Sequence, residues 1–204
     1  MGIWRDHLLP RLVDKALDNE IVEDLRRRSM EGLSGEVVEL GFGSGLNVPL
    51  YPEGVTRVHA IEPASVGRKL AAKRVAASPV EVEYSGLDGE RLPLASASVD
   101  GAVSTFTLCT IDDVQTALAE VRRVLRPGGA LYYCEHGLAP DAGVVTWQRR
   151  IEPLQRLICG GCRLTRPIET LLTDAGFTLE RPEADWVESL PKYVGYTYLG
   201  VART

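Results

Sequence analysis

The chain has 204 residues, a formal net charge of −5 and a pI near 5.3, with 45% hydrophobic and 25% charged residues. This length suits one domain with a full hydrophobic core, and the acidic balance argues against nonspecific binding of nucleic acid. No apolar run approaches a membrane span and the N-terminus lacks a signal-peptide pattern. We therefore expect a cytoplasmic protein, monomeric or homodimeric, without stable membrane insertion.

The N-terminal segment is predicted to be helical. Apolar residues recur every three to five positions through residues 4–31, where Pro10 limits the first helix and Gly32 is a plausible stop. The run Arg26-Arg27-Arg28 is interpreted as a solvated helix face.

Strands and helices then alternate along the chain. Strands are predicted at 37–40, 57–61, 80–84, 99–104 and 130–135, helices at 45–50, 65–77 and 112–125, and a tight turn at 126–129. The remaining elements are helices at 146–157 and 166–175 and strands at 177–181 and 196–202. This order predicts an α/β fold with a Rossmann-like, doubly wound, mostly parallel seven-stranded sheet, N-terminal helices and a helical lid after the fifth strand.

The strand at 37–40 runs into a glycine-rich turn with the order acid-x-Gly-x-Gly-x-Gly, from Glu39 to Gly45. Glycines at alternate positions let the backbone approach a ligand, which an open α/β sheet binds at the carboxyl end of such a strand. A dinucleotide site instead requires Gly-x-Gly-x-x-Gly, and the Glu39 carboxylate would repel a pyrophosphate but suits a cationic ligand. The spacing and the acid together resemble motif I of class I S-adenosylmethionine-dependent methyltransferases.

The second strand ends at Glu62, about twenty residues after the glycine turn. A carboxylate there can accept hydrogen bonds from both hydroxyls of a ribose, and the alternative is a surface glutamate that caps the next helix. A ribose site fits NAD and S-adenosylmethionine equally, because both carry adenosine.

Residues 86–94 read Gly-Leu-Asp-Gly-Glu-Arg-Leu-Pro-Leu, which resembles the Asp-Ala-Glu-x-Leu-Pro segment of many small-molecule methyltransferases. The resemblance implies that Asp88 accepts a hydrogen bond from the adenine amino group and that the N–H of Gly89 meets a ring nitrogen. It also implies that Leu87 covers one face of the base. The residues alone leave open a polar turn before Pro93.

Two more segments, 97–103 and 121–129, match the fourth strand and the passage into the fifth strand of the same superfamily, so the resemblance covers about residues 36–136. Downstream, residues 105–111, 134–136 and 161–166 resemble methyltransferase type 11-like proteins. That group includes bacterial phosphatidylethanolamine N-methyltransferase-like proteins and animal methyltransferase-like thiol S-methyltransferases. The resemblance implies S-adenosylmethionine as cofactor, S-adenosylhomocysteine as product and a small-molecule acceptor, with thiol sulfur favoured over oxygen or amine nitrogen.

The resemblance also divides the chain and assigns a cofactor site. We expect one methyltransferase domain, with a helical cap at 1–34, a cofactor-binding core at 35–136, a helical lid at 137–176 and closing strands at 177–204. Glu39 is expected to attract the cofactor ammonium, and Thr105 to lie near the methionine part. The expected cofactor-binding residues are Glu39, Gly41, Phe42, Gly43, Gly45, Asn47, Glu62, Pro63, Leu87, Asp88, Gly89, Thr105 and Phe106.

His136, directly after the fifth strand, is the candidate base or substrate-orienting group at the edge of the cleft, and the alternative is a histidine bonded to the lid backbone. Cys159 and Cys162 have C-x-x-C spacing, but no second such pair or nearby histidine pair completes a zinc site, so we expect no metal. Cys109 and Cys162 are interpreted as small apolar fillers. The candidate acceptor contacts are Trp4, His7, Trp147 and Gln148.

Two rival functions remain at this point. A nicotinamide-dependent oxidoreductase is disfavoured by the early third glycine and by Glu39. A noncatalytic S-adenosylmethionine-binding protein could keep the glycine turn and Glu62 yet lack an acceptor pocket beneath the lid.

Overall fold

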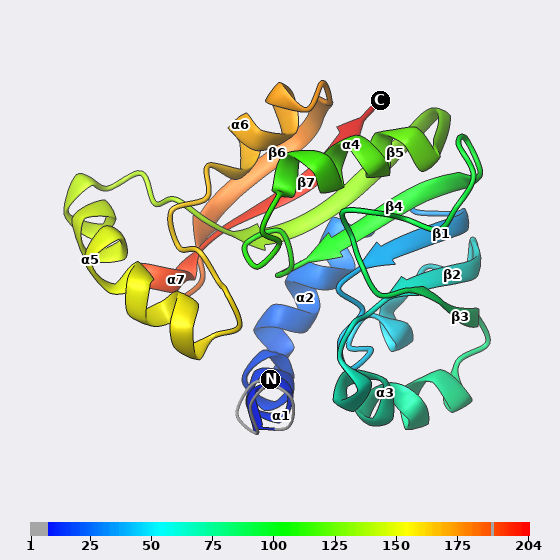
Figure 1. The fold of residues 1–204 in the computed structure, drawn as a ribbon, viewed down its shortest axis with the longest axis horizontal. Coiled ribbons are helices and arrows are strands. Elements are labelled where there is room, and N and C mark those ends of the chain that lie inside the picture. The colour runs from blue at the N-terminus through cyan, green and yellow to red at the C-terminus, as the bar shows by residue number, and fades with distance from the viewer. Residues whose placement is uncertain (1–7, 189) are drawn as a thin grey trace.

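The computed structural model describes residues 8–188 and 190–204, so the predicted acceptor contacts Trp4 and His7 lie outside the described residues. The described residues form one seven-stranded sheet in the order β3-β2-β1-β4-β5-β7-β6 (Figure 1). β1 to β5 pair in parallel, and β7 runs antiparallel to its neighbours β5 and β6. The prediction of a mostly parallel, seven-stranded α/β sheet is confirmed. The strands are β1 (Gly35–Leu40), β2 (Val55–Ile61), β3 (Glu81–Gly86), β4 (Val99–Thr105), β5 (Leu125–His136), β6 (Thr178–Trp186) and β7 (Tyr196–Arg203).

Helices cover both faces of this sheet. They are α1 (Leu9–Leu17), α2 (Glu20–Ser29), α3 (Ser65–Ala77), α4 (Val114–Val124), α5 (Ala142–Ile158), α6 (Ile168–Asp174) and α7 (Lys192–Gly195). α4 and α6 cover one face, whereas α2 and α3 cover the other (Figure 1). α5 packs beside α7, next to the end of the sheet at which β7 begins. None of the helices within the described ranges is long and apolar enough to cross a bilayer.

The alternation of side chains along the strands brings two polar groups beneath α2. Val38 of β1 belongs to the core under α4 and α6, whereas Val37 belongs to the core under α2 and α3. Because successive side chains point to opposite faces, Glu39 shares the face of Val37. On β4, Thr105 shares in the same way the face of Val103. Glu39 and Thr105 therefore lie on the same face of the sheet, near the carboxyl ends of neighbouring strands.

The helix predicted at 45–50 is wrong. The glycine turn leads into a single 3-10 turn, η2 (Val48–Leu50), and the chain is extended again at Tyr51. Gly45 holds a φ of +74°, which lies outside the helical region, and Pro52 keeps the residue before it out of the helical conformation.

The tight turn predicted at 126–129 also takes another form. These residues belong to the start of β5, where the pairing with β4 jumps from Val99↔Leu125 to Gly101↔Ala130. The extra residues bulge out of the ladder, and Gly128 takes a φ of +82° there. Asp100, opposite the bulge, accepts a hydrogen bond from the backbone N–H of Glu36 and pairs with Arg126, so it links the starts of β1, β4 and β5.

Candidate functional site

Two adjoining cavities, of about 250 Å³ and about 380 Å³, open at the carboxyl ends of β1, β2 and β4. They share five lining residues, Gly41, Glu62, Thr107, Thr110 and Gly160. Of the predicted cofactor-binding residues, all but Gly45 and Asn47 line one cavity or the other. Glu39, Thr105 and Phe106 line the smaller cavity, and Leu87, Asp88 and Gly89 line the larger one. The structure therefore brings together residues that are far apart in the sequence, from Glu39 to Phe106.

The glycine turn is shaped by positive φ angles and by close packing. Gly41, Gly43 and Gly45 have φ values of +63°, +56° and +74°. A Cβ on Gly41 would lie 2.2 Å from the hydroxyl oxygen of Thr107, so a side chain there has no room. A Cβ on Gly67 of α3 would lie 2.8 Å from the carbonyl oxygen of Gly43. Glycine at these positions lets the turn expose its backbone to both cavities.

Glu62 stands on the wall between the two cavities and is 6% exposed. One carboxylate oxygen accepts a hydrogen bond from the N–H of Gly43, and the other accepts one from the N–H of Ala64, both at 2.6 Å. Burial raises the pKa of Glu62, although these two bonds oppose the shift. Each oxygen keeps a second lone pair, so the carboxylate can still accept hydrogen bonds from a ligand.

Glu39 is buried in the smaller cavity and accepts hydrogen bonds from the Tyr51 hydroxyl and, at 3.0 Å, from the Asn47 amide. Burial raises the pKa of Glu39 to about 7, against the opposing effects of these bonds and of the Arg26 charge. A cation that enters the cavity would therefore meet a carboxyl group that changes charge near neutral pH. Asn47, which lines neither cavity, supports the site by orienting Glu39.

Arg26 is the functional candidate that the sequence reasoning missed. Its guanidinium donates to the Asn47 side-chain oxygen at 2.9 Å and to the Thr105 hydroxyl at 2.7 Å, and it lies 5.3 Å above the Phe106 ring. The side chain is 5% exposed and lines the smaller cavity, so its interpretation as a solvated face is wrong. Burial lowers the pKa of Arg26. Its Nε has no hydrogen-bond partner among the described residues.

The signal that identifies Arg26 is its position on α2. The buried residues of this helix are Val22, Arg26 and Ser29, which recur at helical spacing. The apolar residues Ile21 and Leu25 of α2 instead line a different pocket, and Ile21 is 47% exposed. A helical pattern that starts from Val22 as a buried position predicts that Arg26, four residues later, is buried on the same face.

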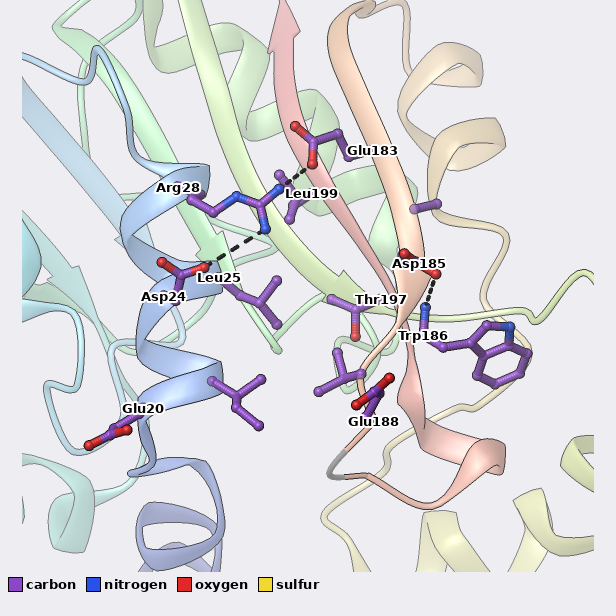
Figure 2. Close-up of a pocket in the computed structure, with 13 residues that line it drawn as sticks. Glu20, Asp24, Leu25, Arg28, Glu183, Asp185, Trp186, Glu188, Thr197 and Leu199 are labelled. Carbon is purple, nitrogen blue, oxygen red and sulfur yellow. Dashed lines mark hydrogen bonds and ion pairs between the residues drawn. The ribbon is translucent and has the colours of Figure 1, made fainter.

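That other pocket, of about 500 Å³, lies between α2 and the strands β6 and β7 (Figure 2). Acidic side chains line it, and Arg28 reaches across it from α2 to Glu183 while staying near Asp24 (Figure 2). The ion-paired side chains are about half exposed. None of the predicted cofactor-binding residues lines this pocket.

The loop after β4 is held by the buried carboxylate of Glu135. Its carboxylate accepts hydrogen bonds from the Ser104 hydroxyl at 2.7 Å and from the N–H groups of Thr107 and Leu108 at 2.9 to 3.1 Å. These bonds hold Phe106 at a left-handed φ of +54°. The strained loop presents the Phe106 ring to Arg26 and to the smaller cavity.

The cover of the smaller cavity differs from the predicted lid. Apolar residues of α1, together with Cys159 and Gly160, line it, whereas no residue of α5 does so among the described residues. Trp147 of α5 is 61% exposed and lies in a surface groove with Tyr193. Gln148 is fully buried, and its amide bonds the backbone of residues 137, 139 and 193. Trp147 and Gln148, the predicted acceptor contacts on α5, therefore line neither of the two cavities.

His136 is also displaced from its predicted place at the edge of the cleft. Its imidazole is 8% exposed and lines neither cavity, and its Nε2 lies 3.2 Å from the Cys162 sulfur. Burial lowers the pKa of His136, but the hydrogen bond and charge of Cys162 and the charge of Glu135 oppose it, and the net effect is a raised pKa. Cys109 lies in the same group and its hydrogen bond lowers the pKa of Cys162. Both cysteines pack in an apolar cluster with Leu164, as the sequence suggested, and their sulfurs also lie within 4.8 Å of a His136 ring nitrogen.

The chain is similar to known methyltransferases. A family profile described as "Methyltransferase domain" matches residues 38–133, which contain every predicted cofactor-binding residue. The chain is 36% identical over 180 residues to the thiol S-methyltransferase TMT1B of Homo sapiens, covering 82% of this chain and 73% of that protein. It is 35% identical over 176 residues to the thiol S-methyltransferase TMT1A of Homo sapiens, covering 81% and 72%. Among solved structures, an S-adenosylmethionine-dependent methyltransferase of Thermotoga maritima, described as a possible histamine N-methyltransferase, matches with a TM-score of 0.68 at 21% identity over 99% of each chain.

Proposed function

Because this chain belongs to the S-adenosylmethionine-dependent methyltransferases, we propose that it methylates the sulfur of a small-molecule thiol. The rival of a nicotinamide-dependent oxidoreductase is set aside by this membership. The main support for the thiol is the 36% identity to a protein named thiol S-methyltransferase, over most of both chains.

The two cavities fit the proposed cofactor. In this arrangement the smaller cavity, beside Glu39 and Thr105, takes the methionine part, and the larger cavity, beside Asp88, takes the adenine. Glu62, on the shared wall, accepts hydrogen bonds from the ribose hydroxyls. The unpartnered Nε of Arg26 is a spare donor for the cofactor carboxylate.

When bound, S-adenosylmethionine supplies a methyl group whose bond to the sulfonium sulfur breaks as the acceptor sulfur bonds the methyl carbon, with loss of the thiol proton to solvent. The residues of the chain hold the two sulfur atoms in line and exclude water. The apolar side chains of α1 that cover the smaller cavity, Leu9, Val13 and Leu17, suit an acceptor with an apolar body.

We propose that the acceptor arrives as a thiolate. No histidine within the described ranges lines either cavity, so His136 is not positioned to act as the direct base. Only the thiolate is nucleophilic, and its fraction at a given pH rises as the thiol pKa falls. We therefore expect aromatic thiols of low pKa to be methylated faster than aliphatic thiols at neutral pH.

The test is release of S-adenosylhomocysteine with a panel of acceptors that differ only in the nucleophile. Matched aromatic thiols, phenols and amines are compared at one pH, with the methylated product identified by mass spectrometry. We expect the thiols to be methylated and the matched phenols and amines to give only background release. Methylation of amines or phenols in preference to thiols would contradict the proposed acceptor.

Glu39 predicts a pH dependence of cofactor binding. The ionised carboxylate attracts the cofactor ammonium, so binding favours loss of the proton from Glu39, whose pKa is about 7. We expect affinity to rise with pH and to be about tenfold weaker at pH 6 than at pH 7.5. Calorimetry across this range should show the slope in the unaltered protein and a nearly flat profile in Glu39→Gln. Equal slopes in both proteins would exclude Glu39 as the titrating group.

We also propose that the protein is cytoplasmic. All four cysteines are free, which fits a reducing compartment such as the cytoplasm. The proposed assembly is a monomer or a homodimer.

A further inference from the structure

Three metal-ligating side chains meet beside the smaller cavity. Cys109 follows β4, His136 ends β5 and Cys162 follows α5, so the group joins three separate segments of the chain. Their donor atoms, two sulfurs and one imidazole nitrogen, all lie within 4.8 Å of one another. The Cys162 sulfur lies 3.2 Å from Nε2 of His136. In a tetrahedral zinc site the corresponding donor atoms are about 3.5 to 3.8 Å apart, given Zn–S near 2.3 Å and Zn–N near 2.0 Å.

The donor set selects the kind of ion. Two thiols and one imidazole are soft or borderline ligands, which suit Zn²⁺ and exclude Mg²⁺ and Ca²⁺, since those ions take oxygen ligands. Cys109, His136 and Cys162 are 2%, 8% and 5% exposed. Two thiolates this deeply buried would need a counter-charge, which a divalent cation bound to both would provide.

The surroundings hold the three ligands in place without competing for them. The N–H of Arg163 donates to the backbone oxygen of Cys109 at 2.9 Å, which ties the loop after β4 to the loop after α5. Apolar side chains, including Leu164, Ile151 and Val194, pack around the two cysteines. Outside the group of three, the two sulfurs contact the oxygen of Phe106 and the amide of Gln155, and both of these distances are long, at 3.8 Å.

We propose that Cys109, His136 and Cys162 form a zinc-binding site that links the two loops beside the cofactor cavity. Binding displaces the thiol protons to solvent and leaves the fourth tetrahedral position for a non-protein ligand. The site is independent of the methyl acceptor, because its ligands line neither cavity. The site lies next to the cavity wall, since the lining residues Thr110 and Gly160 are close in sequence to the ligands Cys109 and Cys162.

The test measures metal content in protein that carries no histidine tag. The unaltered chain, incubated with zinc and then desalted, is expected to retain about one zinc per chain by elemental mass spectrometry. Cobalt substitution should give thiolate-to-metal charge-transfer absorption. Chelation should lower the melting temperature by roughly 10 °C, as expected for loss of a tightly bound ligand. Cys109→Ser and Cys162→Ser are expected to lose at least nine-tenths of the metal.

Cys134→Ser is the matched control, because Cys134 is a buried free cysteine on β5 that does not belong to the cluster. It should keep the metal. Three results would overturn the proposal: unaltered protein that retains no metal, equal retention by Cys162→Ser, or a disulfide between Cys109 and Cys162 in freshly purified protein. If a cluster variant fails to fold, the metal content and cobalt spectrum of the unaltered chain decide the question. Failure of the thiol assay would leave these results unchanged, so the two proposals fail separately.

Discussion

Glu62→Ala is expected to weaken binding of S-adenosylhomocysteine about 100-fold, because hydrogen bonds to a charged, buried acceptor are lost. The carboxylate is buried on the wall between the two cavities and keeps free lone pairs on both oxygens. The product is the better probe, since it carries the same ribose without the reactive sulfonium. Calorimetric titration of the unaltered protein and the variant measures the difference directly.

Glu62 also accepts hydrogen bonds from the N–H groups of Gly43 and Ala64, so the variant could weaken binding by loosening the glycine turn. A thermodynamic cycle, in which both proteins bind the product and its 2′-deoxy and 3′-deoxy forms, separates the loss of ribose hydrogen bonds from a loosened glycine turn. In the unaltered protein each deoxy form should bind about tenfold more weakly than the full product, whereas in Glu62→Ala the three ligands should bind alike. The same deoxy penalty in both proteins would remove the ribose assignment.

A surface carboxylate on the neighbouring strand provides the control. Glu81 of β3 pairs with Arg57 and its side chain is 61% exposed, so Glu81→Ala removes a carboxylate without touching either cavity. The affinity of Glu81→Ala for the product should equal that of the unaltered protein, since exposed ion pairs contribute little to the stability of the fold.

The sheet could be predicted because its strands are short apolar segments bounded by turn residues. The strand at Val37 and Val38 is buried on both faces, so its apolar pattern is continuous and stands out from the neighbouring helices. The position of Glu39 and Glu62 at strand ends then placed both carboxylates at the ligand-binding edge of the sheet. The positions of Glu39 and Glu62 could be predicted because each follows from the local pattern of a strand and the turn after it.

The sequence did not predict the features that depend on contacts between distant segments of the chain. Arg26 belongs to a basic run that is usually solvated, and only the packing of α2 against Asn47 and Thr105 buries it. The cluster joins three residues that are far apart in the sequence, Cys109, His136 and Cys162, so no local spacing pattern indicates it. Spacing rules detect ligands that share a turn or a helix, and this group shares neither.

The predicted helical lid at 137–176 borders the cavities only through Cys159 and Gly160, for a related reason. α5 was expected over the cleft because an insertion after the fifth strand starts at the carboxyl edge of the sheet. In the structure Gln148 bonds the backbone around residues 137 and 193, which fixes α5 beside α7 instead. Only the loop at Cys159 and Gly160 returns to the cavity, and α1 supplies the remaining cover.

Arg26→Met is expected to destabilise the protein by about 3 kcal/mol, because it leaves the Asn47 oxygen and the Thr105 hydroxyl buried with a lost partner. Methionine keeps most of the length of the side chain and removes the guanidinium. Arg27→Met is the matched control, since Arg27 is the next residue on α2 and its side chain is 57% exposed. Its ion pair with Glu23 lies on the surface, so the change should stay within about 0.5 kcal/mol. Urea unfolding of the three proteins measures both effects.

A purely structural role for Arg26 and a role in the cofactor site differ in one measurable respect. The charge of Arg26 lowers the pKa of Glu39, so its removal should move the midpoint of the pH dependence of cofactor binding above 7. Arg26→Met should also weaken binding at pH 7.5, because the proposed donor to the cofactor carboxylate is lost. Arg27→Met should leave the midpoint and the affinity unchanged. A variant that loses stability but keeps the midpoint near 7 would show that Arg26 only supports the fold, and that Glu39 titrates without its influence.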